Sequence, residues 1–92
     1  MKRLRWSLAA AADLEAIDSY LRQYHPTFAV PTIQRLYDAA KSLREHPYLG
    51  RPGKRADIRE MVLAPLPYVL VYSVSSEAIH ILRFLHTSRD RQ

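Results

Sequence analysis

The chain has 92 residues and a formal net charge of +5; 48% of its residues are hydrophobic, two are glycine and none is cysteine. This length predicts a single domain over residues 1–92, while the lack of cysteine and the scatter of four histidines exclude disulfides and lead us to expect no metal and no cofactor. The excess of basic residues favours an acidic partner, either a nucleic acid or an acidic protein.

The first predicted elements are a short strand and a helix. Residues 2–6 alternate basic and apolar side chains, which predicts an edge strand with Leu4 and Trp6 on one side. Ser7 is a favourable N-cap residue for a helix over residues 8–24, where apolar side chains recur every three or four positions. The apolar stripe of this helix consists of Leu14, Ile17, Leu21 and Tyr24.

A second helix is predicted over residues 27–45, with Thr27 as its cap. Pro26 ends the first helix and Pro47 ends the second, because the residue before a proline is disfavoured in the α region. The apolar stripe of the second helix consists of Val30, Ile33, Leu36, Ala40 and Leu43. Two amphipathic helices with a short connection predict an antiparallel hairpin that buries one face.

Three strands are predicted in the second half of the chain, after a loop over residues 48–57 that contains both glycines. The first covers residues 59–63, the second residues 68–74 and the third residues 78–86. The second is an almost unbroken apolar run, which predicts burial on both faces. Strict alternation in the third would place Phe84 on the face opposite Ile79 and Ile81.

The sequence therefore predicts an α+β fold with the order β-α-α-β-β-β. We expect an antiparallel sheet with the N-terminal helical hairpin packed on one face. The other face would be open beside the loop over residues 48–57, here called the basic loop, and beside the C-terminus. No segment approaches the roughly 18 apolar residues of a membrane span, and the first residues lack the apolar core of a signal peptide. We expect a cytoplasmic protein.

Three stretches carry a family resemblance: the linker HPYLGRPGKRADIRE, the strand PYVLVYSV and the ending ILRFLHTSRD. In this order they resemble the RelE/ParE superfamily of bacterial type II toxins, over essentially the whole chain. The resemblance implies a growth-inhibiting toxin that a cognate antitoxin neutralises. We expect the antitoxin to contribute an acidic segment that folds on binding, because this chain is basic.

RelE-like members of the superfamily cleave mRNA on the ribosome, which requires groups that move protons and cations that stabilise the phosphorane. The resemblance to RelE is poor at its cationic positions, because this chain has Glu60, Val62 and Val69 there instead of cations. Only Arg89 matches a cation of RelE, and no tyrosine follows it.

An RNase site would have to use other residues, and the candidates are His86, Arg89, Arg83 and Glu60. His86 suits a general base because a neutral imidazole is available near pH 7. Three of them also have a structural alternative. Glu60 is an ion-pair partner or a solvated strand residue, His86 caps the strand end, and Arg83 pairs with an acid or extends from an apolar face.

ParE-like members share the fold and inhibit DNA gyrase without a nuclease site. The loss of RelE-type cations and the ending LHTSRD favour this branch. The candidates for contact with the target or with nucleic acid are Arg51, Lys54, Arg55, Arg59 and Arg89. Two alternatives stay open: a ribosome-dependent endoribonuclease, and a non-toxic protein that acts only with its antitoxin in a DNA-binding repressor complex.

Overall fold

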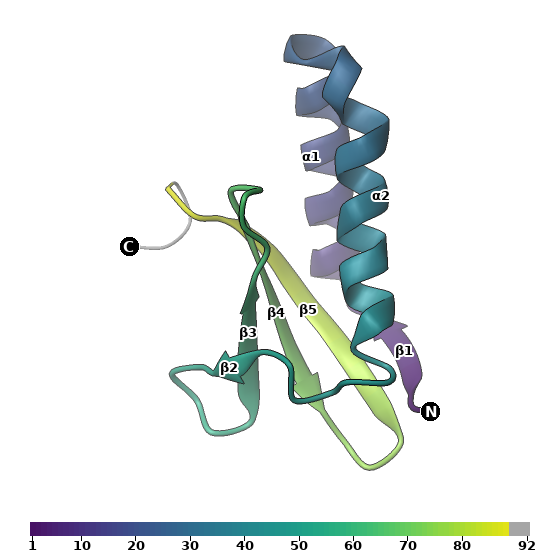
Figure 1. The fold of residues 1–92 in the computed structure, drawn as a ribbon, viewed down its shortest axis with the longest axis vertical. Coiled ribbons are helices and arrows are strands. Elements are labelled where there is room, and N and C mark those ends of the chain that lie inside the picture. The colour runs from purple at the N-terminus through teal and green to yellow at the C-terminus, as the bar shows by residue number, and fades with distance from the viewer. Residues whose placement is uncertain (89–92) are drawn as a thin grey trace.

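The computed structural model describes residues 1–88 as a helical hairpin packed on one face of a five-stranded sheet (Figure 1). Along the chain the elements are β1 (Arg3–Trp6), α1 (Leu8–Tyr24), α2 (Pro26–Ser42), β2 (Arg51–Pro52), β3 (Ile58–Val62), β4 (Tyr68–Val74) and β5 (Ala78–His86). The predicted α+β class and the helical hairpin are confirmed. Within this part of the chain, no helix combines the length and apolarity that a bilayer crossing requires.

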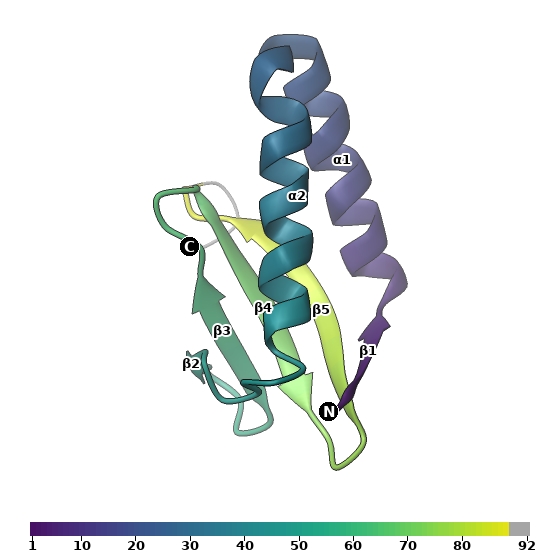
Figure 2. The same ribbon diagram turned by 45° about the vertical axis from the view of Figure 1, so that its right-hand side comes forward.

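The sheet is mixed, with the strand order β1-β5-β4-β3-β2. The antiparallel meander of β3, β4 and β5 is confirmed, but β1 pairs with β5 in parallel, with Leu4 beside Ile79. The reason is the helical hairpin, which carries the chain away from the sheet and returns it to the end where β1 began (Figure 2). β3 and β5 therefore run in the direction of β1, and the prediction of a wholly antiparallel sheet was wrong.

The predicted loop over residues 48–57 contains one short additional strand, β2. Arg51 pairs with Glu60 and Pro52 with Arg59, antiparallel to β3. Proline is tolerated there because β2 is an edge strand, where a missing N–H breaks no inner ladder.

α1 has the predicted bounds, and Ser7 caps it as expected. The Ser7 hydroxyl accepts a hydrogen bond from the Ala10 amide at 2.9 Å and donates one to the Leu82 carbonyl at 2.9 Å, so it also ties the helix start to β5. Leu14, Ile17 and Leu21 are buried. Tyr24 was wrongly placed in the stripe: it is 59% exposed, because the end of the hairpin rises past the sheet (Figure 1).

α2 differs from its prediction at both ends. It begins at Pro26, with His25 rather than Thr27 at the N-cap and no side-chain cap bond; proline suits the first helical position, where an amide would lack a partner anyway. It ends at Ser42, and residues 43–45 form a turn. The small Ala29 is buried at the hairpin end while Val30 is 65% exposed, so Val30 does not belong to the core stripe.

A β-bulge changes the faces of β5. Val71 pairs with Arg83 but Tyr72 pairs with Ile81, which leaves Leu82 as an extra residue. The extra residue returns Phe84 to the face of Ile81, and Phe84 is only 2% exposed. The strict alternation expected for this strand was therefore wrong beyond Ile81.

The core lies between the helical hairpin and the sheet face that it covers, here called the helix face. Its members are Ala10, Leu14, Ile17, Leu21, Ala29, Leu36, Ala40, Leu43, Tyr68, Leu70, Tyr72, Ile79, Ile81 and Phe84. Side chains that alternate with the inward-facing ones along β3 and β4, such as Glu60 and Val62 on either side of Met61, point to the opposite face, here called the open face. Burial on both faces of β4 is confirmed at Val69 and Leu70, which are 1% and 0% exposed.

Candidate functional site

His86 lies at the end of β5, in a pocket of about 290 Å³ between the sheet and α1. The pocket is lined by Asp13, Ala16, Ile17, Tyr20, Tyr68, Phe84 and His86. The imidazole meets the Tyr68 ring edge-on, with 5.5 Å between the ring centres. Its position on the helix face follows from its pairing with Tyr68, a member of the core.

The His86 ring caps the end of β5, which is the structural alternative expected for it. Its Nδ1 accepts a hydrogen bond from the Ser88 amide at 3.2 Å and lies 2.9 Å from the Ser88 hydroxyl. Because an amide is always a donor, Nδ1 acts as an acceptor in this arrangement. A proton acceptor role for Nδ1 would require these bonds to be released.

Glu60 lies on the open face of the sheet, away from His86. Its neighbour Met61 packs against the core, so the alternation of β3 directs Glu60 to the other side. The Glu60 side chain is 15% exposed, and its Oε1 is 3.6 Å from Nη2 of Arg51. The structure thus supports its alternative as an ion-pair partner and does not bring Glu60 and His86 together.

Arg83 is held by a carboxylate from α1. Its Nε and Nη2 donate to the two carboxylate oxygens of Asp13 at 2.7 and 3.0 Å. The same Asp13 oxygen that takes Nε also accepts the Phe84 amide at 3.0 Å. The pairing of β1 with β5 ends at Ile81, so Asp13 satisfies an edge amide that β1 does not reach. The alternative in which Arg83 pairs with an acid is the one that the structure adopts.

Arg59 anchors the basic loop. Its guanidinium donates to the Gly50 carbonyl from Nε at 3.0 Å and from Nη2 at 2.7 Å, and it lies 5.2 Å from the centre of the Tyr48 ring. Close by, the Tyr72 hydroxyl donates to the Pro47 carbonyl at 2.9 Å and accepts from the Gly50 amide at 2.8 Å. Arg59 therefore holds the loop against the sheet.

The remaining contact candidates of the loop are exposed. Arg51 is paired with Glu60, and Nε of Arg55 is 3.8 Å from Asp57. Lys54 lies between the two arginines in the sequence, in the turn that joins β2 to β3. Arg89 lies outside the described residues.

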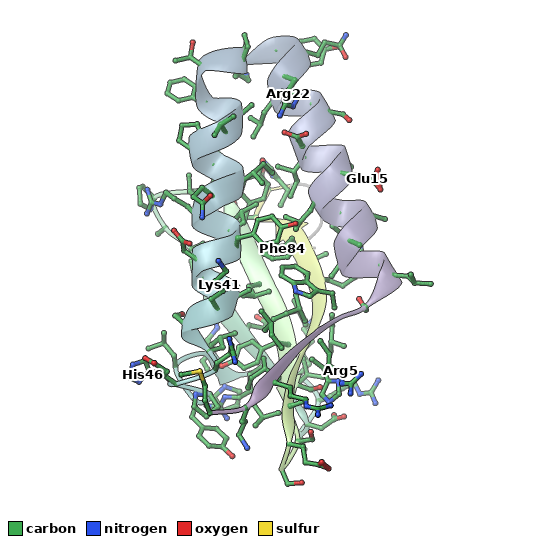
Figure 3. All side chains as sticks on the ribbon, turned by 90° about the vertical axis from the view of Figure 1, so that its right-hand side faces the viewer. Arg5, Glu15, Arg22, Lys41, His46 and Phe84 are labelled. Carbon is green, nitrogen blue, oxygen red and sulfur yellow. The ribbon has the colours of Figure 1, made fainter. Side chains whose placement is uncertain are left out.

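A groove of about 540 Å³ separates α1 from α2 on the side of β1. It is lined by Trp6, Ala11, Leu14, Glu15, Asp18, Arg22, Val30, Ile33, Gln34 and Tyr37. Trp6 lies 5.9 Å from Phe84 and 5.3 Å from Tyr37, measured between ring centres. Figure 3 faces this side, with Phe84 seen between the two helices and Glu15 and Arg22 on α1. We name it the hairpin groove.

A second groove, of about 580 Å³, follows β1 and was not foreseen from the sequence. It is lined by Arg3, Leu4, Arg5, Trp6 and Arg44. The alternation in residues 2–6 signalled an edge strand with exposed arginines, but nothing local signalled that Arg44, 42 residues after Lys2, donates to the Lys2 carbonyl at 3.0 Å. We name it the β1 groove.

Comparison with protein families places residues 4–91 under one family model, described as the ParE toxin of the type II toxin–antitoxin system parDE. The chain is 38% identical over 85 residues to a putative toxin, Y4kP, of Sinorhizobium fredii, and the aligned residues cover 92% of this chain and 88% of that protein. It is 42% identical over 89 residues to toxin RelE2 of Caulobacter vibrioides, and the aligned residues cover 97% of this chain and 99% of that protein.

Among solved structures, a chain of the chromosomal ParDE toxin–antitoxin system from P. aeruginosa superposes with a TM-score of 0.85. The two chains are 28% identical, over 96% of this chain and 98% of the other. The similarity therefore extends over the whole architecture.

Proposed function

The chain belongs to the family of ParE toxins of type II toxin–antitoxin systems, and on this premise we propose that it inhibits growth by acting on DNA gyrase. The resemblance to the RelE/ParE superfamily is confirmed by the family match, the toxin relatives and the ParDE structure. A cognate antitoxin is accordingly its partner. The choice of gyrase over mRNA as the target is our proposal.

The separation of the RNase candidates is the observation that favours gyrase. General acid–base catalysis requires groups within hydrogen-bond reach of one substrate. Glu60 and His86 lie on opposite faces of the sheet, Nδ1 of His86 is occupied by Ser88, and Arg83 is bound to Asp13. Inhibition of gyrase requires a binding surface and no such constellation.

The exposed cations of the basic loop are our contact candidates for gyrase or gyrase-bound DNA. Arg51, Lys54 and Arg55 present their side chains to solvent, and a polyanionic target attracts them. Arg59 contributes indirectly, by holding the loop in place through the Gly50 carbonyl. Arg89 remains a candidate from the sequence alone.

Two reactions with purified components test the proposal. The toxin is added to gyrase with supercoiled DNA and ATP, and in parallel to a reconstituted translation reaction with a labelled mRNA. We expect linear DNA to accumulate in the first reaction and intact mRNA in the second. Cleaved mRNA with unchanged gyrase activity would overturn the proposal.

A ribosome-dependent endoribonuclease is the second candidate, because His86 lines a pocket with Tyr20 and Asp13. For this function, His86→Gln would abolish mRNA cleavage at unchanged stability. Cleavage that survives the substitution would remove His86 from the site.

A non-toxic repressor partner is the third candidate, and expression in a bacterial host without antitoxin separates all three. We expect thymidine incorporation to fall before methionine incorporation. The reverse order would favour the endoribonuclease, and unchanged growth would favour the repressor complex.

We further propose that the antitoxin docks in the hairpin groove. Its lining exposes apolar side chains that the core does not use, with Val30 at 65% and Tyr37 at 41% exposure. An antitoxin segment that folds on binding would cover them with its own apolar face.

Val30→Asp tests this docking site, and Leu8→Asp is its matched control. Leu8 is 91% exposed and does not line the groove, so both variants place one charge on an exposed apolar position of a helix. We expect only Val30→Asp to weaken antitoxin binding in calorimetry, by at least tenfold. Equal affinities of the two variants would place the antitoxin elsewhere.

A further inference from the structure

Several cations gather along the outer edge of β1. In the part of the chain that the structure describes, β1 is an edge strand, with β5 on one side and no strand on the other. Arg3 and Arg5 are exposed, and Arg44 joins them from the turn after α2 to line the β1 groove. Within the described residues, no carboxylate lines this groove.

Lys2 adds a fourth positive charge next to the groove. Its Nζ donates to the carbonyls of Ser75 and Ser76 at 2.9 and 3.0 Å. These acceptors carry no net charge, so they do not neutralise the ammonium group. Nε of Arg44 is likewise bound to a carbonyl, that of Lys2. These bonds fix two of the cations in position beside Arg3 and Arg5.

Within residues 1–88 the cations of this edge form no ion pair, whereas two cations of the basic loop do. The ion pairs formed within residues 1–88 join Arg22 to Asp18, Arg51 to Glu60, Arg55 to Asp57 and Arg83 to Asp13. None of them includes a cation of the β1 edge. Glu45 and Glu77 line the adjoining pocket with Lys2, Arg3 and Arg44, so two carboxylates stand near four cations, and an anion near β1 still meets an excess of positive charge.

The spacing of Arg3 and Arg5 fits a chain of anions. They alternate with Leu4 and Trp6, which pack against the core, so both arginines project from the same side of the strand. Their Cα atoms are two residues apart, about 7 Å along a strand, close to the repeat of phosphates in an extended nucleic-acid strand. Each guanidinium can bind a phosphate through two parallel hydrogen bonds.

From these observations we infer that the β1 edge binds the phosphodiester backbone of nucleic acid through Arg3, Arg5 and Arg44. Cations alone read no base sequence, so the contact is independent of sequence. It is separate from the contacts proposed for the basic loop and does not require gyrase to be the target. Its failure would leave the gyrase proposal standing.

Basic residues on an edge strand also have a protective role, because charge discourages pairing with other chains. That role is served by a charge of either sign, whereas phosphate binding needs a positive one. The double variant Arg3→Glu with Arg5→Glu keeps the first property and removes the second. Arg3→Lys with Arg5→Lys keeps both and is the matched control.

The experiment measures fluorescence anisotropy of the full-length toxin with two labelled probes, a short DNA duplex of mixed sequence and a single-stranded RNA. We expect the glutamate variant to bind at least about tenfold more weakly. The slope of log K against log salt for the duplex should fall by about 1.8, which is about 0.9 for each of two lost phosphate contacts. The lysine variant should keep the slope.

Unchanged melting temperature and monomeric elution of the glutamate variant establish that folding and edge protection persist. A loss confined to the duplex or to the RNA supports the inference and identifies which backbone fits. Wild-type binding of both probes would overturn it. If antitoxin binding were weaker in that case, the groove would take an acidic protein segment instead of nucleic acid.

Discussion

Replacing Asp13 by alanine removes a carboxylate that joins α1 to the edge of β5. The side chain is 17% exposed, and its Oδ2 accepts from both the Phe84 amide and Nε of Arg83. Loss of the acceptor leaves the Phe84 amide unsatisfied at a cost of about 1–3 kcal/mol. The ion pair adds only about 0.5–1 kcal/mol, since the Arg83 side chain is 48% exposed. We expect Asp13→Ala to lower the free energy of unfolding by about 2–3 kcal/mol.

Two further variants divide this loss between the two interactions. Asp13→Asn keeps an oxygen for the Phe84 amide and should cost about 1 kcal/mol. Arg83→Ala leaves Asp13 bonded to that amide and should cost less than about 1 kcal/mol.

The measurement is urea denaturation monitored by the fluorescence of Trp6. Trp6 is the single tryptophan, and its ring centre lies 5.9 Å from that of Phe84. For a domain of this size, each kcal/mol also shifts the melting temperature by about 4–8 °C. The reasoning would be refuted by a loss below about 0.5 kcal/mol for Asp13→Ala. An equal loss for Arg83→Ala would refute it too, since the ion pair would then dominate.

Two other predictions concern the basic loop, the second together with the C-terminal Arg89. Tyr72→Phe deprives the buried Gly50 amide of its acceptor and should lower the free energy of unfolding by about 1–3 kcal/mol; Tyr24→Phe, on a ring that is 59% exposed, should leave the unfolding curve unchanged. Arg55→Glu combined with Arg89→Glu should weaken growth inhibition while circular dichroism shows a folded protein, and full toxicity of that variant would contradict the contact assignment.

The order of elements was predictable because its signals are local. Ser7 at a helix start and the apolar repeat of the helix lie within a few turns of one another, and α1 has the predicted bounds. The parallel pairing of β1 depends instead on where two helices return the chain. The bulge at Leu82 depends on pairing with β4, which the pattern of β5 alone does not reveal.

The candidate residues show the same division. The sequence singled out Arg83, His86 and Glu60, together with the structural alternatives that the fold adopts. It did not reveal Asp13 as the partner of Arg83, because 70 residues separate them. From the alternation in residues 2–6 it predicted only an edge strand, because Arg44 reaches that edge only after α2 has folded back.

The sequence by itself determined the helices, the three meander strands, the α+β class and the toxin superfamily, since periodicity, capping and characteristic stretches are properties of neighbouring residues. The tertiary structure alone decided the direction of β1, the face of Phe84 and which basic residues have acidic partners. Hydrogen bonds and ion pairs act over a few ångströms in space. Which positive charges remain available to a target is therefore decided only when segments distant in the sequence fold together.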